Sequence, residues 1–167
     1  MRRATATARL DSPLGMISLA ANDACLLGVR ISRDGAPDAH GDAGWNPILD
    51  LALLQLSQWF TGERTAFDLP LAPPGSPEGD VLRAGIAAIP YGETLTYGAL
   101  AAQTGSVARA VGQACKTNPY PLIIPCHRVI SSAGPEYYSA GDGPRTKTWL
   151  LDFEYAHLPP ERRTRLI

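Results

Sequence analysis

Ile123-Ile124-Pro125-Cys126-His127-Arg128-Val129-Ile130 places a thiol directly before an imidazole, with apolar residues ahead of them and a β-prone pair behind. The thiolate is the reactive form of cysteine, and a neighbouring histidine can help to generate it. Proline fixes its own φ and restricts the residue before it, so Pro125 predicts a stiff backbone at Cys126. The alternative is a chance Cys-His pair in a buried strand, because a cysteine is more often a small buried hydrophobe than a nucleophile.

The composition around this stretch is that of an ordinary globular protein. The chain has 167 residues, of which 45% are hydrophobic and 19% charged, enough for one large domain or two small ones. No apolar run is long enough to span a membrane, and the basic N-terminus lacks the apolar region of a secretory signal. We therefore expect a cytoplasmic protein with no membrane partner.

Cysteine spacing and charge exclude several classes of function. Cys25, Cys115 and Cys126 are widely separated and form no C-x-x-C pair, which argues against a disulfide framework and a structural zinc site. We expect no metal and no cofactor. Residues 1–75 carry six Lys and Arg against eight Asp and Glu, and residues 76–167 carry nine against eight. Any DNA binding must therefore rest on a local surface, not on a global positive charge.

A Pro- and Gly-rich segment, residues 69–79, predicts a boundary between two domains, 1–75 and 76–167. Before it, the pattern predicts three strands, at 5–10, 16–20 and 24–31, with a turn at 12–15 between the first two. A surface loop is expected at 32–45, followed by a helix from Pro47 to about Phe60. Asn46 is the expected N-cap of that helix. Its expected apolar face comprises Ile48, Leu51, Leu56, Trp59 and Phe60.

The second half of the sequence predicts four helices. They are expected at 81–89, 96–103, 106–116 and 145–155, with Ser106 as the cap of the third. The two central helices, joined at Thr104-Gly105, form a helix-turn-helix pattern. By itself this pattern is weak evidence of a DNA-binding motif, because short helical hairpins are common structural elements.

Glu154 is a candidate partner for His127, the residue next to the thiol. It lies three and four residues after Leu151 and Leu150, on the apolar face of the last predicted helix. A buried carboxylate needs a partner, so Glu154 either sits solvated at the rim or orients His127. The second reading gives a Cys-His-Glu relay, in which the carboxylate fixes the imidazole tautomer.

Together these motifs resemble one family, the O6-alkylguanine-DNA alkyltransferases, over about residues 86–155. The matching pieces share order and approximate spacing with the family. They are Ile89-Pro90-Tyr91-Gly92-Glu93-Thr94 with Tyr97, Arg109-Ala110-Val111-Gly112, Asn118-Pro119, Ile124-Pro125-Cys126-His127-Arg128-Val129, Tyr138-Ser139, and Lys147-Thr148-Trp149-Leu150-Leu151 with Glu154. The resemblance implies an α+β fold. A small ribonuclease H-like sheet-plus-helix domain would precede a mostly helical, winged-helix-like domain with the helix-turn-helix.

The resemblance also implies a reaction. Cys126 would take an alkyl group, mainly methyl, from O6 of guanine in double-stranded DNA, leaving a stable thioether after one turnover. O4 of thymine stays open as a second substrate. His127 would accept the thiol proton through a water, Glu154 would stabilise the imidazolium, and Tyr97 would donate a hydrogen bond to guanine N3.

The family's DNA-binding residues map onto the same region. The base must be flipped out, and Arg109 would fill its space while small Ala108 allows close approach in the minor groove. Asn118 would bridge this helix to the active-site segment. The carbonyls of Cys126 and Val129 would read the exocyclic amine, and Tyr138, Ser139 and Ala140 would form the wall near O6. We expect a monomer.

The chain departs from the family pattern in three places. In the helix before Pro90, the chain has Glu78, Gly79 and Arg83 where the family has an aromatic-Gln pair and a Trp. The turn of the helix-turn-helix is about two residues shorter than in the family. The loop through Ala140 to Pro144 is longer, and Ala140 replaces a glycine. We therefore expect methyl to be accepted and benzyl disfavoured.

Two other classes of function remain open. One is a lesion-binding module without transfer, against which Cys126 argues. The other is a Cys-His hydrolase, for which adjacent Cys126 and His127 give an awkward geometry.

Overall fold

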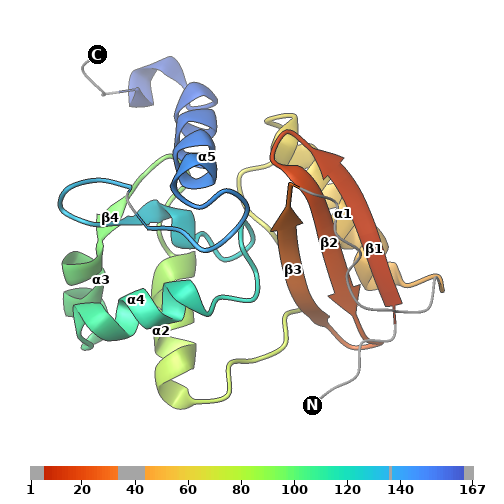
Figure 1. Cartoon of the computed structure of the whole chain (residues 1–167), viewed down its shortest axis with the longest axis horizontal. Helices are drawn as coiled ribbons and strands as arrows, with labels where there is room; N and C mark the ends of the chain where they lie inside the picture. Colours follow the sequence, from red (N-terminus) through yellow and green to blue (C-terminus); the bar gives the residue numbers. More distant parts are fainter. Residues whose placement is uncertain (1–5, 34–43, 136, 164–167) are drawn as a thin grey trace.

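The computed structural model describes residues 6–33, 44–135 and 137–163. The predicted loop 32–45 falls mostly outside these ranges. Figure 1 shows two parts, a sheet backed by one helix and a group of helices beside it, joined by extended chain. The predicted α+β fold, with a small sheet-plus-helix part before a mostly helical part, is confirmed.

The N-terminal part is an antiparallel sheet in the order β1-β2-β3, made of β1 (Ala6–Ser12), β2 (Gly15–Ala21) and β3 (Leu26–Ser32). The predicted turn joins β1 to β2, and the Ser12 hydroxyl donates to the Gly15 carbonyl at 2.7 Å. Gly15 has a φ of +104°, and a Cβ there would lie 2.6 Å from the Ser32 carbonyl oxygen. Only glycine fits this turn, because the strand beside it passes too closely for a side chain.

The helix behind the sheet is α1 (Pro47–Phe60), and its predicted cap is confirmed. The Asn46 side chain accepts hydrogen bonds from the N–H groups of Ile48 and Leu49 at 2.9 and 3.1 Å. The predicted apolar face is partly wrong, because Leu51 is 40% exposed while Leu49 is buried. These two residues lie about 200° apart around the helix axis, so they cannot share a face.

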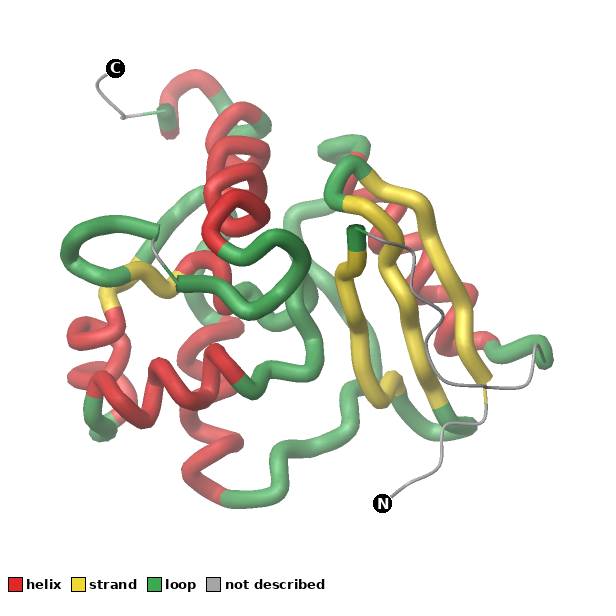
Figure 2. The backbone as a smooth tube through the Cα atoms, in the orientation of Figure 1, coloured by secondary structure: helices red, strands yellow, loops and turns green. Residues whose placement is uncertain are grey.

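The C-terminal part is mostly helical, and Figure 2 shows long loops between its elements. Its two short strands pair in parallel. In chain order it contains α2 (Pro77–Ala87), β4 (Leu95–Thr96), α3 (Tyr97–Thr104), α4 (Ala108–Lys116), the 3-10 turn η1 (Cys126–Arg128), β5 (Val129–Ile130), α5 (Pro144–Ala156) and the 3-10 turn η2 (Pro160–Arg162).

Two predicted helix starts are wrong. Helix α2 begins at Pro77, four residues earlier than expected, because the Ser76 side chain caps it by accepting from Gly79 N–H at 3.1 Å. Ser106 does not cap α4. Its N–H donates to the Ala101 carbonyl at 2.9 Å, after Gly105 in the left-handed conformation, so Ser106 completes the end of α3. Val107 is the N-cap of α4, with no side-chain hydrogen bond.

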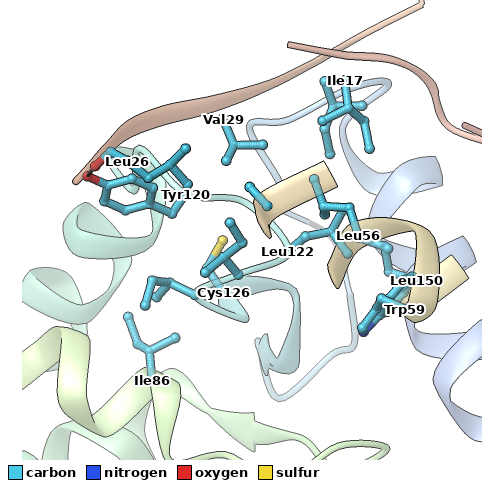
Figure 3. Close-up of a cluster of buried hydrophobic side chains, with 14 of the residues drawn as sticks. Ile17, Leu26, Val29, Leu56, Trp59, Ile86, Tyr120, Leu122, Cys126 and Leu150 are labelled. Atoms are coloured by element: carbon cyan, nitrogen blue, oxygen red, sulfur yellow. Dashed lines mark hydrogen bonds between the residues drawn. The ribbon is translucent and has the colours of Figure 1, made fainter. Parts of the chain in front are cut away.

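The two parts are joined through the free edge of β3. Val29 N–H donates to the Pro119 carbonyl at 2.8 Å, and Leu26 forms a bridge with Leu71. The buried Tyr120 hydroxyl donates to the Leu26 carbonyl at 2.8 Å and accepts from Ala72 N–H at 3.0 Å. Figure 3 shows Tyr120 beside Leu26, in the same apolar cluster as the Cys126 sulfur.

Within the described ranges, no helix has both the length and the apolar character needed to cross a membrane.

Candidate active site

Cys126 sits on a tight turn that the preceding proline sets up. Cys126 N–H donates to the Ile124 carbonyl at 2.7 Å, and Arg128 N–H donates to the Pro125 carbonyl at 2.9 Å. The three residues Cys126–Arg128 form a 3-10 turn, and β5 begins only after it. The Cys126 side chain is buried against the core, with 3% of the residue exposed.

Glu154 brings three segments together at this turn. His127 Nε2 lies 2.7 Å from Glu154 Oε1. Arg128 donates from Nε to both carboxylate oxygens at 3.0 Å and from Nη2 to Oε1 at 2.7 Å. Gly92 N–H donates to Oε2 at 3.2 Å. The carboxylate is fully buried, so the predicted pairing with His127 is present and the solvated alternative is not.

The charges of this cluster fix the protonation of His127. Burial alone would raise the pKa of Glu154, but hydrogen bonds from His127 and Arg128, together with the Arg128 charge, outweigh it and lower the pKa to about 2. Burial lowers the pKa of His127 more than Glu154 raises it. The imidazole is therefore neutral at pH 7, and Arg128 supplies the positive charge that balances Glu154.

A neutral imidazole that bonds a carboxylate through Nε2 carries its proton on Nε2, because the carboxylate can only accept. Nδ1 is then an acceptor. It is buried and has no hydrogen-bond partner among the described residues. A buried nitrogen with a free lone pair costs free energy unless a proton donor arrives, so His127 is set up to accept a proton.

The Cys126 thiol is held by Asn118, whose Nδ2 lies 3.2 Å from Sγ and also donates to the Ile124 carbonyl at 3.0 Å. Asn118 Oδ1 accepts from Tyr120 N–H at 3.0 Å. Burial raises the pKa of Cys126, while the Asn118 hydrogen bond and the Lys147 charge lower it less. The resting sulfur is therefore a thiol, and it needs a base to become a nucleophile.

Lys147 is a buried cation beside the thiol. Its Nζ donates to the carbonyls of Val129 and of Tyr137, the latter at 2.8 Å, and lies 5.8 Å from the centre of the Tyr97 ring. Burial lowers its pKa, and negative charge on Cys115 or Cys126 would raise it. A thiolate at Cys126 would thus be stabilised by this ammonium group.

A cavity of about 770 Å³ opens at Cys126 between α4 and the loop before α5. Five predicted site residues line it, namely Tyr97, Ala108, Cys126, Tyr138 and Ser139. The remaining lining residues are Gly112, Cys115, Lys116, Tyr137 and Pro144. Burial, followed by the charges of Cys115, Cys126 and Tyr137, raises the pKa of Tyr97 to about 12, so its hydroxyl remains a donor.

The other predicted site residues lie around this cavity. Val129 is buried, and its carbonyl already accepts one bond from Lys147, which leaves one lone pair. Arg109 is exposed in the first turn of α4, and no hydrogen bond or ion pair to a described residue is seen for it.

Ala140 lines a second cavity, of about 390 Å³, between β3 and the loop at 139–142. Cys126 and Ser139 line both cavities. The expected preference for methyl over benzyl rested on Ala140 narrowing the wall of the alkyl pocket. Ala140 is not among the residues that line the larger cavity, and the preference stays a prediction.

Sequence reasoning missed three residues of the site: Arg128, Tyr137 and Lys147. Cys115 packs against the core and also borders the cavity, with no part in the chemistry. Lys147 could have been found, because it precedes Leu150 by three residues and Glu154 by seven and so shares their helix face. No pattern in the sequence indicates that Tyr137 lines the cavity.

Comparison with known proteins agrees with this geometry. Residues 79–156 match the DNA-binding domain of the 6-O-methylguanine DNA methyltransferases, and residues 5–73 match the ribonuclease-like domain of the same proteins. A methylated-DNA–protein-cysteine methyltransferase of Mycolicibacterium paratuberculosis is 38% identical over 90% of this chain and 92% of its own. A constitutive one of Bacillus subtilis is 34% identical over 86% and 92%.

Solved structures give the same result. The crystal structure of the O6-methylguanine methyltransferase of Mycobacterium tuberculosis has a TM-score of 0.80 and 34% identity, covering 93% of this chain and 95% of that one. A structure of the same protein in complex with DNA has a TM-score of 0.77, covering 92% and 94%. The site and fold are those of a cysteine-based DNA alkyltransferase. The chain belongs to the 6-O-methylguanine DNA methyltransferase family.

Proposed function

We propose that this protein reverses alkylation damage in DNA by moving an alkyl group, mainly methyl, from O6 of guanine to Sγ of Cys126. The observation that carries the proposal is a buried thiol at an apolar cavity beside a neutral imidazole with a free acceptor nitrogen. Proteins similar to this chain over most of its length carry the name methylated-DNA–protein-cysteine methyltransferase, which supports it.

The first step is removal of the thiol proton. His127 Nδ1 accepts it through a bridging water, and the imidazolium that forms is stabilised by Glu154 through Nε2. The thiolate is stabilised by the Asn118 amide and the Lys147 ammonium group. Arg128 keeps Glu154 ionised throughout, so the carboxylate does not take the proton itself.

The second step is a displacement at the alkyl carbon. A carbon–sulfur bond forms while the carbon–O6 bond breaks, and the electron pair of that bond passes to the guanine. The Tyr97 hydroxyl donates a hydrogen bond to guanine N3 as the negative charge develops. A thioether is a poor leaving group, so each protein molecule reacts once.

DNA recognition rests on α4 and the cavity wall. Arg109, in the first turn of α4, enters the duplex from the minor groove and fills the space of the extruded nucleotide. Ala108 allows close approach, and the carbonyls of Cys126 and Val129 read the exocyclic amine. Ser139, next to Tyr138 in the wall, faces O6. A monomeric state and a cytoplasmic location stay predictions.

Intact-mass spectrometry after incubation with a duplex that carries O6-methylguanine tests the proposal. The wild-type protein should gain one methyl group, and Cys126→Ala should gain none. Cys115→Ala is the matched control, because it removes the other thiol of the cavity and should leave the gain unchanged.

Two results would contradict the proposal. A wild-type protein that is folded, binds the lesion duplex and gains no methyl would be a lesion-binding module. A methyl gain that survives in Cys126→Ala would place the acceptor elsewhere.

A further inference from the structure

Tyr137 is a large aromatic side chain left in solvent at the active-site cavity. The residue is 65% exposed, although the next residue, Tyr138, is half-buried with its hydroxyl inside the protein. Burying an aromatic ring releases more free energy than burying most other side chains. An exposed ring at the edge of a functional cavity therefore suggests that its partner is a ligand.

The backbone of Tyr137 is fixed, while its ring is left free. Its carbonyl accepts from Lys147 Nζ at 2.8 Å, and the same ammonium group donates to the carbonyl of Val129, at the start of β5. Lys147 is itself almost completely buried. A ring on such an anchored backbone loses little conformational entropy when it meets a ligand.

One face of α4 also lines the cavity. Ala108, Gly112 and Lys116 are spaced four residues apart on one face of α4, and all three line the cavity with Tyr137. A Cβ added at Gly112 would meet no heavy atom within 4 Å, so space remains beside this face. Tyr97 and Cys126 line the same cavity as Tyr137, so a base held at the thiol would lie in the cavity that this ring borders.

We propose that the Tyr137 ring stacks on the face of the extruded alkylguanine and holds the base over Cys126. The inference rests on the proposed function and adds a base-binding residue to it. Stacking on an aromatic ring uses the π-face that every base has, so it adds affinity without sequence readout. This suits a protein that must accept its target in any sequence context.

Affinity for two duplexes tests this contact, measured by fluorescence anisotropy with a Cys126→Ser background so that no transfer occurs. One duplex carries O6-methylguanine, and the other carries an abasic site at the same position. Tyr137→Ala should weaken binding to the first about 10-fold and leave binding to the second unchanged, since no base is present to stack. Tyr137→Phe keeps the ring and should restore the affinity.

Trp45→Ala is the control, because Trp45 is also a highly exposed aromatic residue, 81% exposed, but lies just before α1. It should change neither affinity. Equal weakening on both duplexes would place Tyr137 against the DNA backbone and overturn the inference, as would no change on either.

The proposed function is tested separately by methyl transfer to the wild-type protein. Transfer with an unchanged affinity in Tyr137→Ala would refute only the stacking contact. Because the Tyr137 side chain is exposed, its variants should keep the melting temperature of the parent, which checks folding directly.

Discussion

Glu154 combines the roles of counter-ion and hydrogen-bond acceptor in one buried side chain. Arg128 balances its charge, so the carboxylate can hold His127 as a neutral tautomer without being protonated itself. If His127 were its only partner, the carboxylate would form an ion pair with a protonated imidazole. Arg128 and His127, adjacent in the sequence, thus divide the two roles of the carboxylate between them.

Replacing Glu154 with glutamine should destabilise the protein by about 3 to 5 kcal/mol, because Arg128 would be left buried without a counter-ion. The loss should depend on pH. The folded pKa of Glu154, about 2, is below its ordinary value of 4.5, so its stabilisation is complete above pH 4.5 and disappears as the pH falls towards 2.

Urea denaturation at several pH values measures both effects. The stability difference between wild type and Glu154→Gln should shrink between pH 5 and pH 2. A difference that stays constant over this range would show that the carboxylate charge is not what stabilises the site.

The rate of methyl transfer should be independent of pH between about 6.5 and 9.0. The pKa of His127 is lowered from 6.5 and that of Cys126 is raised from 9.0, so the neutral imidazole and the thiol coexist throughout this interval. Below it, protonation of His127 should slow the reaction. Single-turnover kinetics would check this, and a rate that rises tenfold per pH unit from 7 to 9 would mean that His127 is not the base.

At the scale of the elements, α4 presents its first turn to solvent. Arg109→Ala should lower the rate on duplex DNA by at least about 10-fold and leave the rate on free O6-methylguanine unchanged, because the free base needs no extrusion. Arg9→Ala removes an exposed cation from β1 and should change neither rate. Equal losses on both substrates would place Arg109 in the chemistry instead.

The elements most reliably predicted from sequence were those with a local signal. Asn46-Pro47 specified the start of α1 because the cap and the proline act within one turn. Glu154 was found because a carboxylate on an apolar helix face requires a partner. The start of α2 was missed, although Ser76-Pro77 carries the same kind of signal.

The remaining errors come from contacts between distant parts of the chain. Ser106 has the side chain of a helix cap, but its N–H is used by the end of α3. The loop at Ala140 forms a second cavity with β3, more than a hundred residues earlier, which no local pattern indicates; the place of Ala140 in the alkyl pocket stays a prediction. The boundary at residues 75 and 76 stays a prediction.

At the scale of the whole molecule, the Tyr120 hydroxyl connects the two parts. Tyr120→Phe should cost about 0.5 to 1.5 kcal/mol, because the hydroxyl's two hydrogen bonds are lost while Ala72 N–H stays bonded to the Leu26 carbonyl at 3.1 Å. Tyr137→Phe is the control, because this residue is exposed and the expected change is within about 0.5 kcal/mol. Equal stabilities for wild type and Tyr120→Phe, by chemical denaturation, would contradict the role given to this bond.

The edge of β3 also bears on the solubility of fragments. Val29 and Leu26 use their backbone groups to pair with Pro119, Pro70 and Leu71. A fragment cut after the sheet and α1 would expose this strand edge, and an unpaired edge is a template on which other chains can add. The chain after α1, through Pro70, Leu71 and Pro119, thus covers an edge that would otherwise favour aggregation.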